Sequence, residues 1–151
     1  MSTAAEPKLV FPALRGFYDF VADLWYPLIR VAVGGVLFVH GAAKLKAGVS
    51  AVAAGALAKR GIEPALPLAY FIMFLETAGA ICIAIGLFTR PIAAALAIEF
   101  AVIVFVAHWP AGFWAGAGGY EYPLLWGLVI LAIALRGGGP WSVDRALGWE
   151  V

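Results

Sequence analysis

The composition of the chain excludes an ordinary soluble domain. Of its 151 residues, 64% are hydrophobic and 13% are charged, whereas soluble domains are about half apolar and about a quarter charged. The mean hydropathy is +0.97 and the formal net charge is +1. We therefore expect one integral membrane domain over residues 1–151, with the lipid bilayer as a partner and no nucleic acid.

The first predicted element is an amphipathic helix over about residues 12–24. Apolar side chains recur there at helical spacing, and Arg15, Asp19 and Asp23 fall on the opposite face. A helix of this kind lies in the membrane interface with its apolar face in the lipid. The stretch lacks the basic start and the cleavage site of a signal peptide. We expect an N-terminal amphipathic interfacial helix ahead of the first span.

Four segments are long and apolar enough to cross a bilayer, which takes roughly 20 residues. They cover about 25–44, 66–88, 91–108 and 120–136. Their apolar runs are continuous and lack the alternation of β-barrel strands. The sequence therefore predicts an all-α fold, an integral membrane four-helix transmembrane bundle.

Two shorter helices are expected outside these spans. In the first loop, Ser50 could cap a helix that runs through Lys59 and ends at Gly61. After the last span, Ser142 could begin one more helical turn.

The distribution of basic residues predicts cytoplasmic termini by a narrow margin. In the four-span topology, five basic residues share the side of the termini: Lys8, Arg15, Arg90, Arg136 and Arg145. Four lie on the other side: Lys44, Lys46, Lys59 and Arg60. The positive-inside rule places the richer side in the cytoplasm.

Three charged residues fall well inside the spans, and we expect them to be structural buried charges: Arg30, Glu76 and Glu99. An unpaired charge at this depth costs several kcal/mol, on the order of 3–5 for a broken pair. We therefore expect Arg30 to pair with Glu76 or Glu99. The alternative is that Arg30 snorkels to the interface.

A second group of ionisable residues gathers where three spans meet the face opposite the termini. His40 and Lys44 close the first span, His108 closes the third and Glu121 opens the fourth. Histidine is half-ionised near neutral pH and exchanges protons with a carboxylate. These four residues are our candidate site. Glu99 is expected to stay outside it, because nine residues separate it from His108 and an ideal helix then turns them to opposite sides.

Cysteine usage excludes one redox chemistry. Cys82 is the only cysteine and lies inside the second span. Without a Cys-x-x-Cys pair, the chain cannot perform intramembrane thiol–disulfide exchange. We expect Cys82 to be a small buried hydrophobe and expect no metal site.

The chain resembles the DoxX family from Arg30 onward. The resemblance rests on the order and spacing of five stretches: RVAVGGVLFVHGAAKL, FLETAGAICIAIGLFTRPIA, EFAVIVFVAHWPAGF, GGYEYPLLW and GGGPWSVD. Two features depart from the family pattern, namely the three glycines before Pro140 and the amphipathic N-terminal stretch.

This resemblance implies a small four-helix protein of the bacterial inner membrane with cytoplasmic termini. Some similar proteins look like the quinone-reducing membrane subunit of a thiosulfate dehydrogenase, and others associate with superoxide dismutase and sulfurtransferase partners. The family has no established catalytic triad to carry over. It leaves open whether the chain has catalytic activity of its own.

The leading hypothesis is a subunit of a redox complex that binds quinone and handles its protons at the periplasmic side. His40 and His108 would donate hydrogen bonds, Glu121 would accept protons, and Lys44 would favour negative charge on the ring. Electrons would come from a partner, because the sequence has no Gly-x-Gly-x-x-Gly and no cysteine cluster.

Two other functions stay open at this point. One is a non-catalytic anchor or assembly subunit of a larger membrane complex, with a homo-oligomer as one form. The other is a single haem bound by His40 and His108 from two helices.

Overall fold

Helices make up all the regular structure of residues 8–148, the part of the chain that the computed structural model describes. The ends of the expected domain, residues 1–7 and 149–151, lie outside that part. In chain order the α-helices are α1 (Arg15–Val21), α2 (Trp25–Ala47), α3 (Val49–Val52), α4 (Ala65–Phe74), α5 (Ala80–Ile85), α6 (Thr89–Val102), α7 (Glu121–Arg136) and α8 (Val143–Leu147). The all-α prediction is confirmed.

Three π-helical segments extend these helices. Ala53–Leu57 follows α3, Leu75–Gly79 joins α4 to α5, and Ile103–His108 continues α6. A π-turn places one extra residue in the helical ladder and is found frequently at functional sites. Here two of the three fall within long apolar helices.

Three helices in the described part are long and apolar enough to cross a membrane: Trp25–Ala47, Ala65–Ile85 and Thr89–Ala111. The fourth predicted span corresponds to α7, which has 16 residues and is thus about 24 Å long. A bilayer core is about 30 Å thick. The membrane character of the chain is confirmed, and the fourth crossing stays a prediction.

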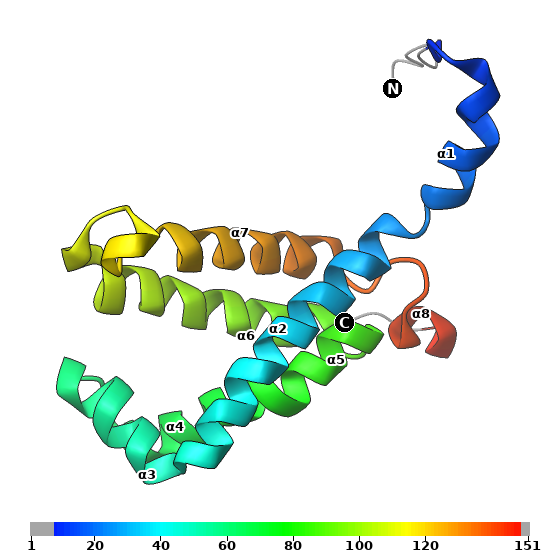
Figure 1. The fold of residues 1–151 in the computed structure, drawn as a ribbon. Coiled ribbons are helices and arrows are strands. Elements are labelled where there is room, and N and C mark those ends of the chain that lie inside the picture. Colours follow the sequence, from blue (N-terminus) through cyan, green and yellow to red (C-terminus); the bar gives the residue numbers. More distant parts are fainter. Residues whose placement is uncertain (1–7, 149–151) are drawn as a thin grey trace.

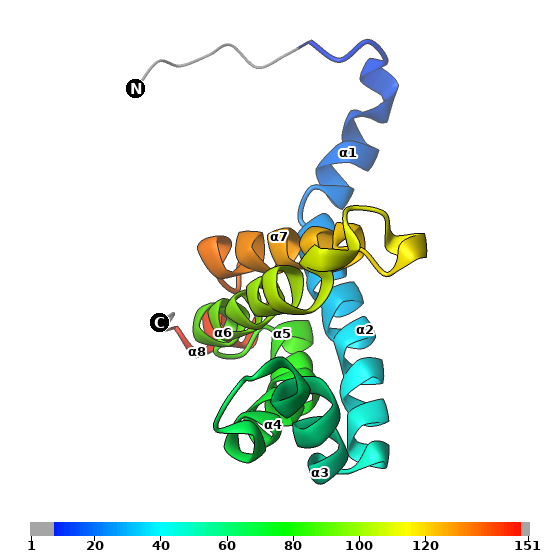
Figure 2. The ribbon, with the colours of Figure 1, turned by 90° about the vertical axis from the view of Figure 1, so that its left-hand side faces the viewer.

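The helices form two pairs that meet at one end and diverge at the other (Figures 1 and 2). α6 and α7 run side by side, while α2 crosses them at an angle and packs against α5 and the π-helical segment before it (Figure 1). We call the end where α2 and α6 begin the terminal end. We call the opposite end, with α3 and loop 112–120, the loop end.

Two glycines let α2 pack closely on the long helix Ala65–Ile85, which we call the second long helix. A Cβ atom on Gly34 would lie 2.4 Å from the carbonyl oxygen of Ala80, and one on Gly41 would lie 2.3 Å from that of Glu76. Small residues at such contacts allow membrane helices to approach each other's backbone. The glycines therefore set the register of α2 against the helix that carries Glu76.

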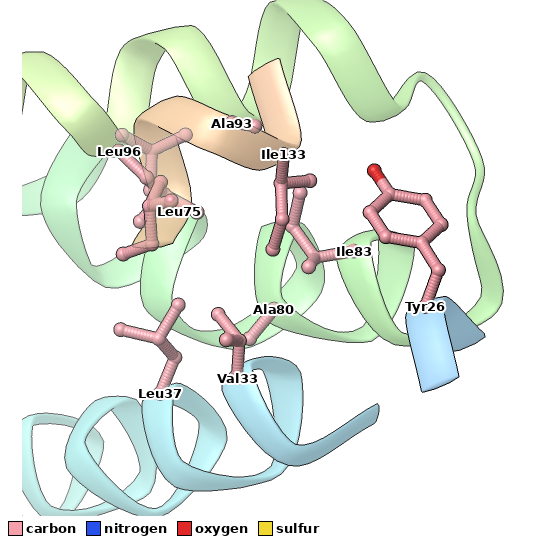
Figure 3. Packing of buried hydrophobic residues seen from close by; sticks show 10 residues of the cluster. Tyr26, Val33, Leu37, Leu75, Ala80, Ile83, Ala93, Leu96 and Ile133 are labelled. Atoms are coloured by element: carbon pink, nitrogen blue, oxygen red, sulfur yellow. The ribbon is translucent and has the colours of Figure 1, made fainter. Parts of the chain in front are cut away.

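Apolar side chains from four helices fill the space where the two pairs meet (Figure 3). Val33 and Leu37 of α2 point into this core, together with Ile83 of α5, Leu96 of α6 and Ile133 of α7. All five are at most 2% exposed. This contact holds the two pairs together near the terminal end.

A network of polar contacts closes the terminal end. The Asp144 carboxylate accepts hydrogen bonds from the backbone N–H groups of Phe88 and Thr89, at 2.8 and 3.0 Å, and from the Thr89 hydroxyl at 2.7 Å. It thereby caps the first turn of α6. Arg30 donates from Nη2 to the carbonyl oxygen of Trp141 at 2.7 Å. The GGGPWSVD stretch therefore has a structural role, because its hydrogen bonds join α2 to the start of α6.

The two short helices are confirmed with one correction. The first-loop helix ends at Gly61, whose φ of +70° favours glycine. It begins earlier than expected, with Gly48 at its N-cap and no side-chain hydrogen bond there, so the prediction of Ser50 as the cap is wrong. Helix α8 follows Ser142, whose hydroxyl accepts from the N–H of Arg145 at 3.2 Å.

At the N-terminus, a 3-10 turn (Pro12–Leu14) leads into the short helix α1. α1 projects away from the helix pairs in both views (Figures 1 and 2). Its apolar side chains Phe17 and Phe20 are 60% and 71% exposed. The helical tendency of the stretch is confirmed, and its place in the membrane interface stays a prediction.

Candidate functional site

A cavity of about 410 Å³ lies between α2, the continuation of α6 and the start of α7 at the loop end. We call it the His40 cavity. Its walls are formed by Val36, Leu37, His40, Lys44, Glu76, Phe100, Ile103, His108, Ala115, Gly118, Gly119, Tyr122, Pro123 and Trp126. Three of the four predicted site residues, His40, Lys44 and His108, therefore face one cavity.

A partly buried ion pair lies in the wall of this cavity. The Lys44 ammonium contacts Oε1 of Glu76, and the two side chains are 28% and 4% exposed. Glu76 lies in the π-helical segment Leu75–Gly79. Its second oxygen, Oε2, is buried and has no hydrogen-bond partner within residues 8–148. The pair thus presents a carboxylate oxygen that a ligand or a proton can use.

The prediction that Arg30 pairs with Glu76 or Glu99 is wrong. Arg30 donates to the carbonyl of Trp141 at the terminal end, and Glu76 pairs with Lys44 instead. Nor does Arg30 snorkel to solvent, since it is only 1% exposed. Its expected burial, and that of Glu76 at 3% exposure, are confirmed.

The direction of helical side chains explains why Lys44, and not Arg30, pairs with Glu76. In an α-helix each Cα–Cβ bond tilts towards the N-terminal end. On α2, Arg30 therefore points towards the terminal end and away from Glu76. Lys44, near the other end of the same helix, points back into the bundle, where Glu76 lies.

His108 is held in one orientation by the loop before α7. Its Nδ1 atom lies 2.7 Å from the carbonyl oxygen of Gly118. Because a carbonyl only accepts, Nδ1 carries a proton, and Nε2 of the neutral ring is then an acceptor. His40, on α2, is exposed at the cavity and makes no hydrogen bond to any other described residue.

Glu121 is the predicted site residue that the structure does not bring into the cavity. Its Oε2 accepts a hydrogen bond from the N–H of Ala115 at 3.0 Å. This contact ties the first residue of α7 to the preceding loop, which also contains Gly118. Glu121 thus shapes the cavity wall through the loop instead of facing the cavity itself.

A second cavity, of about 430 Å³, lies between the first-loop helix, α4 and α6. We call it the Glu99 cavity, and its walls include Lys44, Arg60, Phe71, Glu99, Val106 and His108. Glu99 interacts electrostatically with Glu76 and Lys44, and the Glu76 carboxyl is near enough to share a hydrogen bond with it when one of the two is protonated. Both Glu99 oxygens are buried, and no other described side chain or backbone group bonds to them.

The expectation that Glu99 and His108 cannot face one pocket is therefore wrong. It assumed an ideal α-helix between them, but Ile103–His108 is π-helical. A π-turn takes more residues than an α-turn, so His108 lags behind its α-helical position and rotates back towards the side of Glu99.

Metal-binding geometry is not found in the part of the chain that the structure describes. No three His, Cys, Asp or Glu side chains lie close enough together there to hold an ion. Cys82 is a partly buried free thiol.

Residues 26–109, more than half of the chain, match the sequence model of the DoxX family. The chain belongs to the DoxX family. The matched range contains Arg30, His40, Lys44, Glu76, Glu99 and His108. It ends before α7, so Glu121 and the GGGPWSVD stretch lie beyond it. DoxX proteins are membrane proteins that are often associated with redox or quinone-related complexes.

Comparison with individual proteins adds nothing to this assignment. No curated protein and no solved structure matches this DoxX chain. The identity of its site therefore has to come from its own geometry.

Two features of the cavity were missed at the sequence level. The sequence predicted only a structural role for Glu76, although Glu76 lines the His40 cavity. It gave no sign that Tyr122 and Trp126 form the aromatic wall of this cavity. The available signal was Gly41, since a glycine one turn before Lys44 can bring a second helix close enough for the lysine to reach it.

Proposed function

We propose that this DoxX protein is the membrane subunit of a redox complex and binds a quinone head group in the His40 cavity. The observation that carries the proposal is the Lys44–Glu76 ion pair, which lies partly buried in the wall of an otherwise largely apolar cavity beside two histidines. A structural membrane helix rarely holds such groups, because each is costly at that depth.

The cavity fits the chemistry of a quinone. Leu37, Phe100 and Trp126 offer apolar and aromatic surface for a ring. Lys44 and the His40 ring can donate hydrogen bonds to carbonyl oxygens. Tyr122, which is 50% exposed, lines the cavity on the outer surface of α7, so a lipid tail can leave towards the bilayer.

The residues of the chain would move protons at this site. A bound quinone supplies two-electron redox chemistry. His108 can accept a proton at Nε2, because its Nδ1–H is held by the Gly118 carbonyl. Glu76 can accept one at its unpartnered Oε2, and Lys44 favours negative charge near the ring. In this proposal the proton-accepting role expected of Glu121 falls to His108 and Glu76.

The proposal also includes a place in the cell. The protein would lie in the bacterial inner membrane with cytoplasmic termini, so the His40 cavity would be near the periplasmic face. Electrons would reach the quinone from a partner subunit.

Quinone extraction from the gently purified protein tests this function. We expect quinone to co-purify in a constant ratio to the chain, and His40→Ala and His108→Ala to lose it. Val39→Ala is the matched control, because Val39 neighbours His40 but is 67% exposed and does not line the cavity. Wild-type protein without quinone, or equal retention by the variants, would contradict the proposal.

The same purification tests the two remaining functions. Variants that keep folding but lose co-purifying subunits, with no quinone in any sample, would identify an anchor or assembly subunit. The exposed apolar aromatic residues Phe113 and Trp114 of the loop before α7 favour that role as a partner contact. A Soret band in the visible spectrum would identify the single-haem alternative.

A further inference from the structure

The Glu99 cavity is separate from the His40 cavity, although the two share part of a wall. Lys44, Ile103 and His108 line both, whereas His40 faces only the first and Glu99 only the second. The Glu99 cavity has a similar volume, about 430 Å³. It is large enough to accept a ligand of its own.

The Glu99 carboxyl in this cavity can accept a hydrogen bond from a ligand. Both carboxyl oxygens are buried, and apart from the neighbouring Glu76 carboxyl no group in residues 8–148 bonds to them. Lys44 interacts with Glu99 electrostatically, but its ammonium contacts Oε1 of Glu76. Burying a carboxyl that lacks a hydrogen-bond donor costs free energy. A ligand that donates to Glu99 removes this cost in addition to forming a hydrogen bond of its own.

The other charges in the wall select among donors. Lys44 and Arg60 line the Glu99 cavity, and the carboxylates of Glu76 and Glu99 already match their two positive charges, so an ammonium ligand would add an unbalanced positive charge. A neutral hydroxyl group can donate to Glu99 without adding that charge. The remaining walls, such as Leu68, Phe71 and Val102, are apolar and favour a lipophilic body.

The bilayer itself can supply such a ligand. Three residues of the cavity wall, Phe71, Ile98 and Val106, are also 50%, 68% and 43% exposed on the outer surface of their helices. In a membrane protein this surface is covered by lipid. A molecule dissolved in the acyl chains can therefore reach Glu99 without crossing water.

We propose that the Glu99 cavity binds a lipid-soluble alcohol or phenol, whose hydroxyl group donates a hydrogen bond to the Glu99 carboxyl. This site goes beyond the proposed quinone site and has the opposite hydrogen-bonding character. The His40 cavity presents donors to carbonyl oxygens, and the Glu99 cavity presents an acceptor to a hydroxyl.

Binding of matched probes to the full chain in lipid nanodiscs tests the proposal. The probes are a long-chain alkylphenol, its methyl ether and an alkylamine of the same length, and calorimetry measures each dissociation constant. We expect the phenol to bind about tenfold more tightly than the ether, which lacks the donor. Equal binding of phenol and ether, or tighter binding of the amine, would overturn the proposal.

Variants of Glu99 test its role directly. Glu99→Leu should reduce phenol binding to the level of the ether, and Glu99→Gln should keep part of the preference through its amide oxygen. Glu99→Leu should also fold, because it removes a buried carboxyl that lacks a partner. Asp19→Asn is the acidic control, because Asp19 is exposed on α1 and lines neither cavity. Unchanged phenol affinity in Glu99→Leu would refute the site.

Two further variants separate this site from the proposed quinone site. His40→Ala should lose quinone and keep phenol binding, since His40 lines only the first cavity. Leu68→Trp should fill the Glu99 cavity, block the phenol and keep quinone. Loss of phenol binding in His40→Ala with no loss in Leu68→Trp would place the phenol in the His40 cavity and refute a second site.

Discussion

Lys44 and Glu76 are separated by 32 residues in sequence, yet they form a partly buried ion pair inside the bundle. Burying two charges is costly, and their attraction repays the cost only while both are present. A second carboxylate, Glu99, interacts with both members of the pair. The stability of this region should therefore depend on the balance of charge more than on any single contact.

A double-mutant cycle on the ion pair tests this dependence. We expect Lys44→Met to lower the free energy of unfolding by about 3–5 kcal/mol, because it leaves the Glu76 carboxylate buried and unpaired. The double variant Lys44→Met with Glu76→Leu should recover most of that loss. Denaturant titration in detergent, followed by circular dichroism, gives the free energies.

Arg30 provides the control for this cycle. Combining Arg30→Leu with Glu76→Leu should give additive losses, because Arg30 contacts Trp141 at the other end of α2. Strong coupling of Arg30 with Glu76, or none of Lys44 with Glu76, would show that the pairing described here is not formed in the membrane.

At the scale of elements, close packing of α2 on the second long helix brings the ion pair together. Gly34 and Gly41 lie one after the other along the contact, facing Ala80 and Glu76. The π-helical segment Leu75–Gly79 falls at the Gly41 contact and carries Glu76. Helix packing and local helix geometry together set the position of the Glu76 carboxylate.

Substitution of adjacent glycines separates packing from helix propensity. Gly34→Ala should lower the free energy of unfolding by about 1–3 kcal/mol, since its Cβ would lie 2.4 Å from the Ala80 carbonyl oxygen. Gly35→Ala has open space and should be neutral or stabilise by up to about 1 kcal/mol through helix propensity. The measurement is the same denaturant titration.

Equal effects at the two glycines would argue against the close contact of α2. A selective loss at Gly34 should also weaken quinone retention in the proposed site, because α2 carries both His40 and Lys44.

For the whole molecule, the open question of architecture is whether α7 crosses the bilayer. It packs along α6 and begins at the loop end, but its 16 residues span only about 24 Å. A short helix can still cross where the bilayer thins or flanking residues snorkel. Arg136 at its end and Tyr122 near its start are suited to that position.

Reporter fusions decide the topology of the chain. We expect fusions at Gly61 and Gly118 to read as external and a fusion at the C-terminus to read as cytoplasmic. The reason is that an odd number of crossings separates each loop from the C-terminus only when α7 spans the membrane. A pair of phosphatase and fluorescent reporters at the three positions measures this.

An external reading at both Gly118 and the C-terminus would leave three crossings and place α7 on the outer surface. The His40 cavity would then open towards the interface, because α7 supplies its aromatic wall. A cytoplasmic reading at Gly61 would instead invert the bundle.

The sequence by itself determined the membrane class, the all-α fold, the first three spans and the gathering of His40, Lys44 and His108 at one end. These features follow from local composition and from the alternation of spans across the bilayer, which needs no knowledge of packing. The family assignment rests on the sequence in the same way.

Only the tertiary structure decided which charges meet and which residues share a cavity. The sequence predicted Arg30 as the partner of Glu76 or Glu99, and only the folded structure shows that Lys44 reaches Glu76 beside the Gly41 contact. Glu99 joined His108 in one cavity because a π-helical segment rotated the helix between them. These contacts depend on how each helix is rotated and how closely two helices approach each other in the folded bundle. Helical periodicity read from the sequence assumes ideal α-helices and contains no information on their packing.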